Sequence, residues 1–431
     1  MKKSFIAASI MATLGVTTTP ITTAQQNEFP TELHPYYQTL QSDGEWGAVL
    51  NYNRLGLLAL DKGHLSLAGH AFDASLQRIE AIYANTESAK KARSFWSAEG
   101  VKDFKGESYE RAMAYYYRGL LFVAEGDYDN ARAAFRSAEY QDTISNDEQY
   151  SGDFGLMSLL AGWSAQCNGD KASAQDLYKQ AINQQNNLVA PDLKANTLIL
   201  VESGTAPSKT TSGQYNEALQ LIGGVDNAVG GTANGVPLAL IGDISWQATT
   251  LGGRAVDQIL DGKASFKAGA DTTAAVAGSA AQVAMNLALS NPYGSNVNDM
   301  LGAGGAMAVI GIGAKLFGKA TKPKADIRSW DNLPSNVFGG FLTNHNDTPI
   351  QVSLTDTSGN TTILEKPAIN SHQGQCQLVV YRNTSGTLPA QAPSNLTERE
   401  RKKVFKLNAA RDAQFRAEAA QLISPETQAT N

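Results

Sequence analysis

The sequence predicts an α+β protein, in which N-terminal α-helical repeats precede a mixed α/β region with a small antiparallel sheet and a C-terminal helix. Two observations carry this prediction. A fixed spacing of small and aromatic residues recurs three times between residues 46 and 185. After residue 196, short segments are rich in β-branched residues or alternate between apolar and polar side chains, which is typical of strands. A chain of 431 residues can bury a large core and hold two or more modules.

The repeats share five positions. In the second copy, Gly119 is followed at fixed offsets by Gly126, Ala131, Phe135 and Ala138. The same offsets occur in two further copies: Gly56, Gly63, Ala68, Phe72 and Ser75, then Gly162, Gly169, Ala174, Tyr178 and Ala181. Ordinary amphipathic helices would explain apolar periodicity, but they would not explain this fixed register of small and aromatic residues.

This register is the spacing of the tetratricopeptide repeat, a pair of antiparallel helices in about 34 residues. The leading glycine and the alanine of each copy let the paired helices approach closely. The aromatic ring fills the space toward the next helix, and the second glycine ends the first helix. We therefore expect a tetratricopeptide-like helical domain over residues 46–185.

The N-terminus has the pattern of a secretory signal. Lys2 and Lys3 precede a short apolar stretch and small residues, which predicts a signal peptide over residues 1–24 with cleavage after Ala24. The apolar stretch is too short to span a bilayer, and no cysteine follows it, so lipid attachment is not expected. Residues 25–45 are a polar lead-in segment. We expect a protein secreted across the inner membrane into the periplasm.

The charge of the chain argues against nucleic acid as a partner. The formal net charge is -6, and loss of Lys2 and Lys3 with the signal peptide would make it -8, because residues 1–24 contain no acidic residue. A mildly acidic chain with mixed charges lacks the basic surface that binds phosphate backbones.

Residues 186–382 are expected to form the mixed α/β domain. The candidate strands are residues 196–203, 236–243, 350–355, 361–366 and 376–381. Residues 203–213, rich in glycine, proline and serine, are predicted to be a loop. Residues 300–314 contain no charge and five glycines, so they suit close packing in a core or, alternatively, contact with a membrane.

The C-terminal part is predicted to be a linker over residues 383–395 and a helix over residues 396–424. Thr397 and Glu400 have the spacing of a capping box at the start of this helix. Its basic residues among glutamates suggest a solvated face. The two cysteines, Cys167 and Cys376, would meet an oxidising compartment after export and could form a disulfide, although a buried, small apolar role also suffices for Cys167.

Three motifs resemble an uncharacterised family of exported bacterial tetratricopeptide-repeat proteins. They lie at residues 104–142, 196–209 and 325–334, and the matching residues are Phe104, Lys105, Gly106, Glu107, Tyr109, Glu110, Arg111, Glu202, Ala206, Pro207, Lys209, Asp326, Arg328, Trp330, Leu333 and Pro334. Members of the family are typically envelope lipoproteins, often encoded near a lipoprotein similar to the curli secretion channel, and no catalytic activity is attached to them. This chain lacks the lipid-attachment cysteine, so anchoring does not carry over.

The matched residues are candidates for an interface between modules. Glu107, Glu110 and Arg111 precede a repeat helix at spacings suited to capping and local ion pairs, and Trp330 is a large anchor in a polar loop. The interface candidates are Lys105, Glu107, Tyr109, Glu110, Arg111, Glu202, Lys209, Arg328 and Trp330.

The sequence shows no catalytic or metal motif. The five histidines lack metal-ligand spacing, and no G-x-S-x-G elbow is present. Residues 313–320 imitate a phosphate-binding loop, but Ala320 removes the hydroxyl that would hold magnesium, and Pro323 breaks the following helix. We therefore expect no cofactor, no metal and no enzymatic activity.

The leading functional hypothesis is a periplasmic protein-protein interaction or scaffold protein that serves envelope or outer-membrane assembly or secretion, with an outer-membrane or secretion-system lipoprotein as one candidate partner. If the repeats stack in the usual way, their first helices line a concave groove. The groove candidates are Asn53, Leu57, Tyr116, Leu120, Leu159 and Trp163. In the other interpretation, the C-terminal module of the same chain fills that groove.

Two alternatives remain beside the scaffold. One is a cell-envelope enzyme with a site between the repeats and the mixed domain, which a cleft lined by perturbed carboxylates would favour. The other is an outer-membrane assembly component that touches lipid through residues 300–314.

Overall fold

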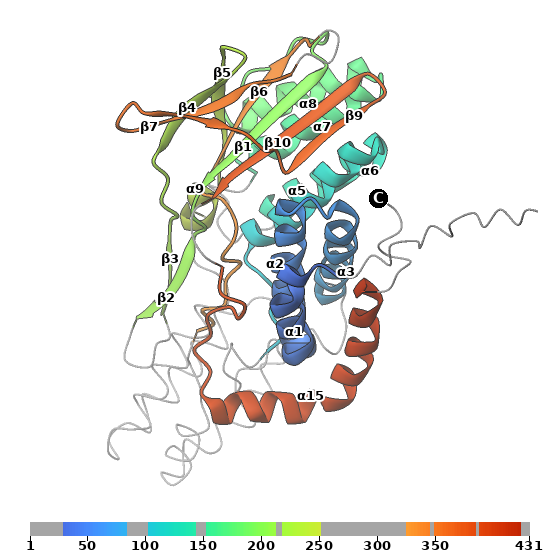
Figure 1. Cartoon of the computed structure of the whole chain (residues 1–431), viewed down its shortest axis with the longest axis vertical. Helices are drawn as coiled ribbons and strands as arrows, with labels where there is room; N and C mark the ends of the chain where they lie inside the picture. Colours follow the sequence, from blue (N-terminus) through green and yellow to red (C-terminus); the bar gives the residue numbers. More distant parts are fainter. Residues whose placement is uncertain are drawn as a thin grey trace, which may run out of the picture.

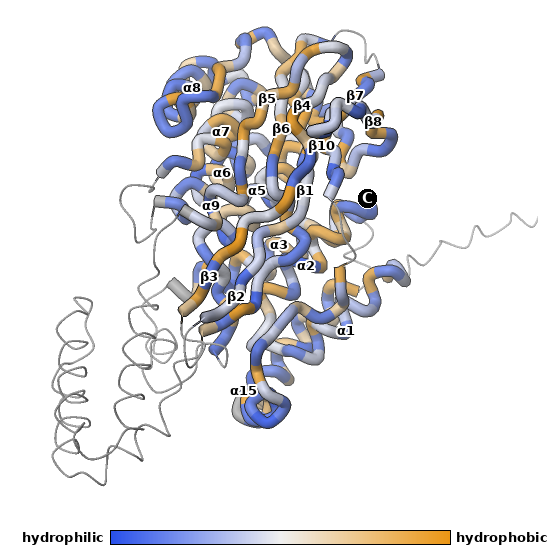
Figure 2. The backbone as a smooth tube through the Cα atoms, turned by 90° about the vertical axis from the view of Figure 1, so that its left-hand side faces the viewer, coloured by the Kyte–Doolittle hydropathy of each residue, from blue (hydrophilic) through white to orange (hydrophobic). Residues whose placement is uncertain are grey.

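The computed structural model describes residues 29–83, 102–143, 152–212, 218–250, 325–344, 349–384 and 388–423. Helical hairpins form a stack, a large sheet covers one side of the upper hairpins, and the C-terminal helix lies across the opposite end (Figure 1). Hydrophilic residues predominate along α8 and α15, at the outside of this arrangement (Figure 2).

Each of the three glycine-containing copies forms a helical hairpin in the described part of the chain. The hairpins are α2 (Ala48–Asp61) with α3 (Leu65–Tyr83), α5 (Ser108–Glu125) with α6 (Tyr128–Thr143), and α7 (Gly155–Cys167) with α8 (Lys171–Gln184). The second glycine of every copy follows the first helix in a left-handed conformation, with φ of 84°, 80° and 84°. The expected helix ends are therefore confirmed.

Close contact inside each hairpin explains the leading glycines. A Cβ atom added at Gly119 would lie 2.6 Å from the Phe135 ring, and one added at Gly162 would lie 2.5 Å from the Tyr178 ring. The aromatic residue thus packs on the glycine of its own hairpin. Phe72 also stacks on Tyr117 of the next hairpin, with ring centroids 5.7 Å apart. Assignment of these hairpins to the tetratricopeptide family stays a prediction.

The described strands form one eight-stranded sheet and one two-stranded ribbon. The large sheet has the order β8-β7-β4-β5-β6-β1-β10-β9 and curls into half a barrel (Figure 1). Its strands are β1 (Thr197–Gly204), β4 (Ala228–Ala233), β5 (Val236–Asp243), β6 (Asn336–Leu342), β7 (Val352–Asp356), β8 (Thr361–Leu364), β9 (Ile369–Gln373) and β10 (Cys376–Thr384). The α+β class holds, but the expected small antiparallel sheet is wrong in size, and β1 pairs with β10 in parallel.

The five predicted strands are present, whereas the predicted loop at residues 203–213 is wrong in part. That segment contains β2 (Ser208–Ser212), which pairs with β3 (Ala218–Ile222). β2 lacks apolar alternation; its ladder with β3 forms the strand, and Lys209 also pairs with the start of α5. β6 carries Gly339 and Gly340, although glycine is unfavourable in strands. Glycine is needed at these positions because neighbouring side chains occupy the space where Cβ atoms would lie.

One hydrophobic core joins the repeats to the sheet. Leu198 and Leu200 of β1 face the helices and belong to the same core as the repeat residues. Ile199 and Val201 point to the opposite face, where they form a second cluster with residues such as Val379. The chain changes from helices to strands after residue 185, but the parts on either side share one hydrophobic core.

The lead-in helices and the C-terminal helix close the lower end of the stack, whereas α9 (Ile244–Thr250) lies beside α5 (Figure 1). The lead-in segment is helical at Thr31–Leu33 (η1) and in α1 (His34–Asp43), followed by η2 (Gly44–Gly47). α9 follows β5. α15 (Glu398–Ala419) begins with the expected capping box of Thr397 and Glu400 and continues into η6 (Ala420–Ile423). Its basic residues are mostly exposed, although Arg401 pairs with Asp43 at 2.6 Å.

The linker expected at residues 383–395 contacts the repeats where the structure describes it. Arg54 of α2 donates to the carbonyl oxygens of Pro389 and Ala390, at 2.5 and 2.8 Å. None of the described helices is long and apolar enough to cross a bilayer. Residues 300–314 and the predicted signal peptide lie outside the described residues.

A disulfide connects the last hairpin to the sheet. Cys167 at the end of α7 is bonded to Cys376 at the start of β10, and the two cysteines are 209 residues apart in sequence. Of the two interpretations left open by the sequence, the structure has the disulfide.

Candidate functional site

A buried polar cluster lies between the sheet and the repeats. Glu202 of β1 and Arg382 of β10 are register partners on neighbouring strands. Arg382 forms ion pairs with Glu202 and with Asp61 at the end of α2. The Tyr117 hydroxyl of α5 donates to Glu202 Oε2 at 2.8 Å and accepts from Arg382 at 2.7 Å. Two strands and two helices thus meet at one pair of opposite charges.

The environment of this cluster favours a structural role. Glu202 is completely buried, and burial raises its pKa while the charge of Arg382 opposes that shift. Burial also raises the pKa of Tyr117 and of Tyr116 well above the ordinary value. The Tyr116 hydroxyl lies near Glu202 and contributes to its electrostatic environment, without a hydrogen bond of good geometry among the described residues. Because the groups are sealed from solvent, a substrate cannot reach them in this conformation.

The three motifs of the family resemblance meet in a second cluster. Lys209 Nζ of β2 lies 3.0 Å from Glu107 and 3.2 Å from Glu110, which form the capping box of α5. Glu110 Oε1 also accepts from the Trp330 amide at 2.6 Å. Burial raises the pKa of Glu110, and the Lys209 charge opposes the shift. These residues join the repeats to two later segments of the chain.

The other interface candidates lie around the same region. Arg328 donates to the Trp46 and Lys102 carbonyl oxygens, at 2.8 and 2.7 Å. Arg111 donates to Gln141 at 2.8 Å. Tyr109 is buried and Lys105 is half-buried.

The expectation of a free concave groove is wrong. The six groove candidates, Asn53, Leu57, Tyr116, Leu120, Leu159 and Trp163, are at most 1% exposed. The Trp163 ring packs against Phe341 of β6, with centroids 5.3 Å apart. The sheet packs against α5 and α7, and residues 331–332 and 389–390 contact α2, so other parts of the same chain fill the groove, as the second interpretation proposed.

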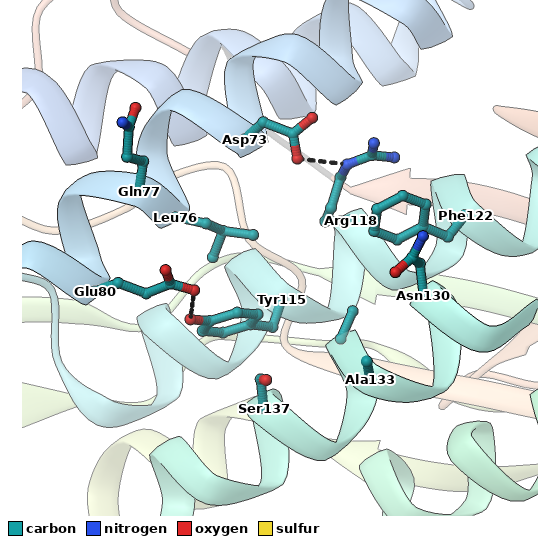
Figure 3. Close-up of a pocket in the computed structure, with 11 residues that line it drawn as sticks. Asp73, Leu76, Gln77, Glu80, Tyr115, Arg118, Phe122, Asn130, Ala133 and Ser137 are labelled. Atoms are coloured by element: carbon teal, nitrogen blue, oxygen red, sulfur yellow. Dashed lines mark hydrogen bonds and ion pairs between the residues drawn. The ribbon is translucent and has the colours of Figure 1, made fainter. Parts of the chain in front are cut away.

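An open hollow lies instead on another side of the repeats, between the first two hairpins. We call it the outer groove; its volume is about 320 Å³ (Figure 3). Its lining residues are Asp73, Leu76, Gln77 and Glu80 of α3, Tyr115, Arg118 and Phe122 of α5, and Asn130, Ala133, Ala134 and Ser137 of α6. Small side chains on α6 face longer, polar ones on α3, which leaves the space between the two helices open.

Charged and aromatic side chains form the floor of the outer groove. The Arg118 guanidinium lies 3.6 Å from the centroid of the Phe122 ring, and it pairs with Asp73 at 2.7 Å and with Glu125 at 3.3 Å. The Tyr115 hydroxyl donates to Glu80 at 3.1 Å (Figure 3). Arg118 is therefore held flat on a ring by two carboxylates, a fixed arrangement that suits recognition of side chains.

The sequence contained a weak signal for this groove. Tyr115, Arg118 and Phe122 recur at helical spacing on the face of α5 opposite to Tyr116 and Leu120. That face carries a mixture of rings and charge, a composition that does not by itself indicate a binding surface. The width of the gap between α3 and α6 depends on packing between hairpins, which a local pattern does not report.

The carboxyl groups with raised pKa values lie elsewhere. Glu110, Glu202 and Asp142 are buried and do not line the outer groove. Within the described ranges, no group of three or more histidine, cysteine, aspartate or glutamate residues is arranged to hold a metal ion. The outer groove thus offers shape, charge and hydrogen-bonding groups to a partner.

The raised pKa of the buried Asp142 carboxyl group at the end of α6 can be tested by its effect on stability. Its carboxylate accepts from the Phe154 amide at 3.2 Å, and burial together with Asp153 raises its pKa from 3.8 to about 7. The folded chain binds this proton more tightly than the unfolded chain, so its contribution to stability falls as pH rises from about 4 to about 7. Asp142→Asn should therefore stabilise the protein at pH 8 by about 2 kcal/mol more than at pH 5.

Urea denaturation at both pH values measures this difference. Asp176→Asn, at an exposed position of α8, is the matched control. If Asp142→Asn shows the same change between the two pH values as the control, Asp142 is not held in a protonated, buried state.

Comparison of the chain with protein-family models, curated proteins and solved structures finds no match. The resemblance to the exported repeat family therefore stays a prediction, and the function is argued from the residues alone.

Proposed function

We propose that this chain is an exported interaction or scaffold protein of the cell envelope, which binds a partner protein through the outer groove. The observation that carries the proposal is that the concave face of the repeats is buried, whereas a different face of the repeats is open. The concave face is filled by the chain's own sheet, while the hollow between α3, α5 and α6 is open and lined by fixed polar and aromatic groups. A groove between helices can accept an amphipathic helix of a partner protein.

Two features support an envelope location. The N-terminal pattern predicts export, and the disulfide between Cys167 and Cys376 is of the kind that persists in oxidising compartments. Envelope or outer-membrane assembly and secretion, with a lipoprotein of that machinery as partner, remain the processes we propose. The enzyme alternative is weaker, because the buried carboxyl groups with raised pKa values do not line the groove.

A photo-crosslinking amino acid at Gln77 tests the docking surface in living cells. Gln77 is exposed on the α3 wall of the groove, and Lys179 is an equally exposed control position on α8. We expect discrete protein adducts from position 77 that are missing from position 179.

Filling the groove should remove those adducts. Ala133 is exposed on the α6 wall, so Ala133→Trp places a large ring in the hollow without entering the core. We expect the yield of adducts from position 77 to fall about tenfold, which corresponds to about 1.4 kcal/mol of binding energy. Ala172→Trp, at an exposed alanine of α8, is the matched control. Adducts that persist at full yield in Ala133→Trp, or that never form at position 77, contradict the proposal.

A further inference from the structure

One wall of the outer groove presents side chains at the spacing of helical turns. On α3, Asp73, Leu76 and Glu80 line the groove at spacings of three and four residues. Seven residues of helix correspond to about 10 Å, or two turns. Acidic groups therefore lie at the two ends of this wall, with an apolar side chain between them. The opposite wall is built from the short side chains Ala133, Ala134 and Ser137.

The charge of the groove is negative. The charged lining residues are Asp73, Glu80 and Arg118, and Glu125 pairs with Arg118 from outside the lining. Two carboxylates and one guanidinium give the lining a net charge of about -1. Arg118 is already paired with Asp73 and Glu125, whereas Glu80 accepts a hydrogen bond from the neutral hydroxyl of Tyr115. A cation arriving at Glu80 would thus find a carboxylate that forms no ion pair with another residue in the described part of the chain.

We infer that the occupant of the outer groove is a cationic amphipathic helix of the partner protein. This helix would carry lysine or arginine at positions i and i+7, opposite Asp73 and Glu80, and an apolar residue at i+3 or i+4, opposite Leu76. An amphipathic helix that lays its apolar face into a groove between helices is a common mode of peptide recognition. This inference rests on the proposed function and adds the chemistry of the partner.

A pair of synthetic peptides tests the inference. One is an amphipathic helical peptide with lysines at i and i+7 and leucine between them; the other has glutamates in place of the lysines. Fluorescence anisotropy with the full chain should show binding of the lysine peptide and about tenfold weaker binding of the glutamate peptide. Raising the ionic strength from about 0.05 M to about 0.5 M should weaken binding of the lysine peptide and reduce the difference in affinity between the two peptides.

A charge swap on the protein makes the test specific to the groove. Glu80 is exposed, so Glu80→Lys should leave the fold intact, which its melting temperature checks. We expect Glu80→Lys to lower the affinity for the lysine peptide about tenfold and to raise the affinity for the glutamate peptide. Glu365→Lys, an exposed position after β8, makes the same change in net charge and should alter both affinities far less.

Three results would overturn the inference: equal affinity for both peptides, no binding of the lysine peptide, or equal effects of Glu80→Lys and Glu365→Lys. Failure here is distinct from failure of the proposed function. Adducts from position 77 that depend on an open groove would leave docking standing and remove only the cationic helix. Absence of those adducts would remove both.

Discussion

Replacing Arg382 by methionine is expected to lower the free energy of unfolding by about 3–5 kcal/mol. The guanidinium is buried, with a side chain 3% exposed, and it is paired with Glu202 and Asp61. Removal of the guanidinium leaves Glu202 in the core without its counter-charge. Breaking a buried ion pair in this way costs far more stability than replacing both partners by apolar residues. Urea denaturation followed by circular dichroism measures the effect. Arg399→Met, at an exposed arginine of α15, should change stability by less than about 0.5 kcal/mol.

A second substitution separates charge from packing at this position. If the penalty comes from the uncompensated Glu202 carboxylate, adding Glu202→Gln to Arg382→Met should restore a large part of the lost stability. Burial already raises the pKa of Glu202, and loss of the Arg382 charge raises it further. The single variant should therefore be closer to the wild type at low pH, where Glu202 takes up a proton. A loss below about 1 kcal/mol in Arg382→Met would show that the sheet and the repeats do not depend on this pair.

Removing the disulfide is expected to have an effect of similar size. The double substitution Cys167→Ala with Cys376→Ala should cost about 3–5 kcal/mol, since the bond closes a loop of 209 residues in the unfolded chain. Thermal or urea denaturation with and without a reducing agent provides an internal control. The wild type under reducing conditions should match the double variant, and the reducing agent should not affect that variant. If the stability of the wild type is independent of the reducing agent, this cross-link is not a major source of stability.

Local parts of the fold were predictable because their cause is local. A glycine that faces a ring sixteen residues later, as Gly119 faces Phe135, is a signal contained within one hairpin. The strand at residues 196–203 is also local, because an uninterrupted apolar run reports burial on both faces. The capping box of Thr397 and Glu400 needs only four residues of sequence.

Long-range parts were not predictable from these patterns. The parallel pairing of β1 with β10 joins residues about 180 positions apart, and no turn between them sets the register. β2 carries polar residues, pairs with β3 and is tied to α5 by Lys209 and Glu110, and none of these contacts is visible in its own local pattern. The burial of Tyr116 and Trp163 has the same origin. Both face a groove in the isolated repeats, and a sheet formed much later in the sequence covers it.

The residues on which the family resemblance rests lie far apart in the sequence but close together in the structure. Glu107, Lys209 and Trp330 come from three separate motifs, yet they lie within one cluster at the start of α5. The resemblance suggested an interface between modules and gave no role to any side chain. The structure adds the roles, since Glu110 accepts from Trp330 and pairs with Lys209.

Native-state hydrogen exchange tests most directly the central claim that the sheet permanently covers the concave face of the repeats. If one core joins the two, amides in the middle of β1 and β10 and of α2, α5 and α7 should exchange only through global unfolding, with the same free energy. Exchange of the β1 and β10 amides at a clearly lower free energy, while α5 stays protected, would contradict the claim. In that case the sheet would open from the repeats, and the concave face would again be available to a partner.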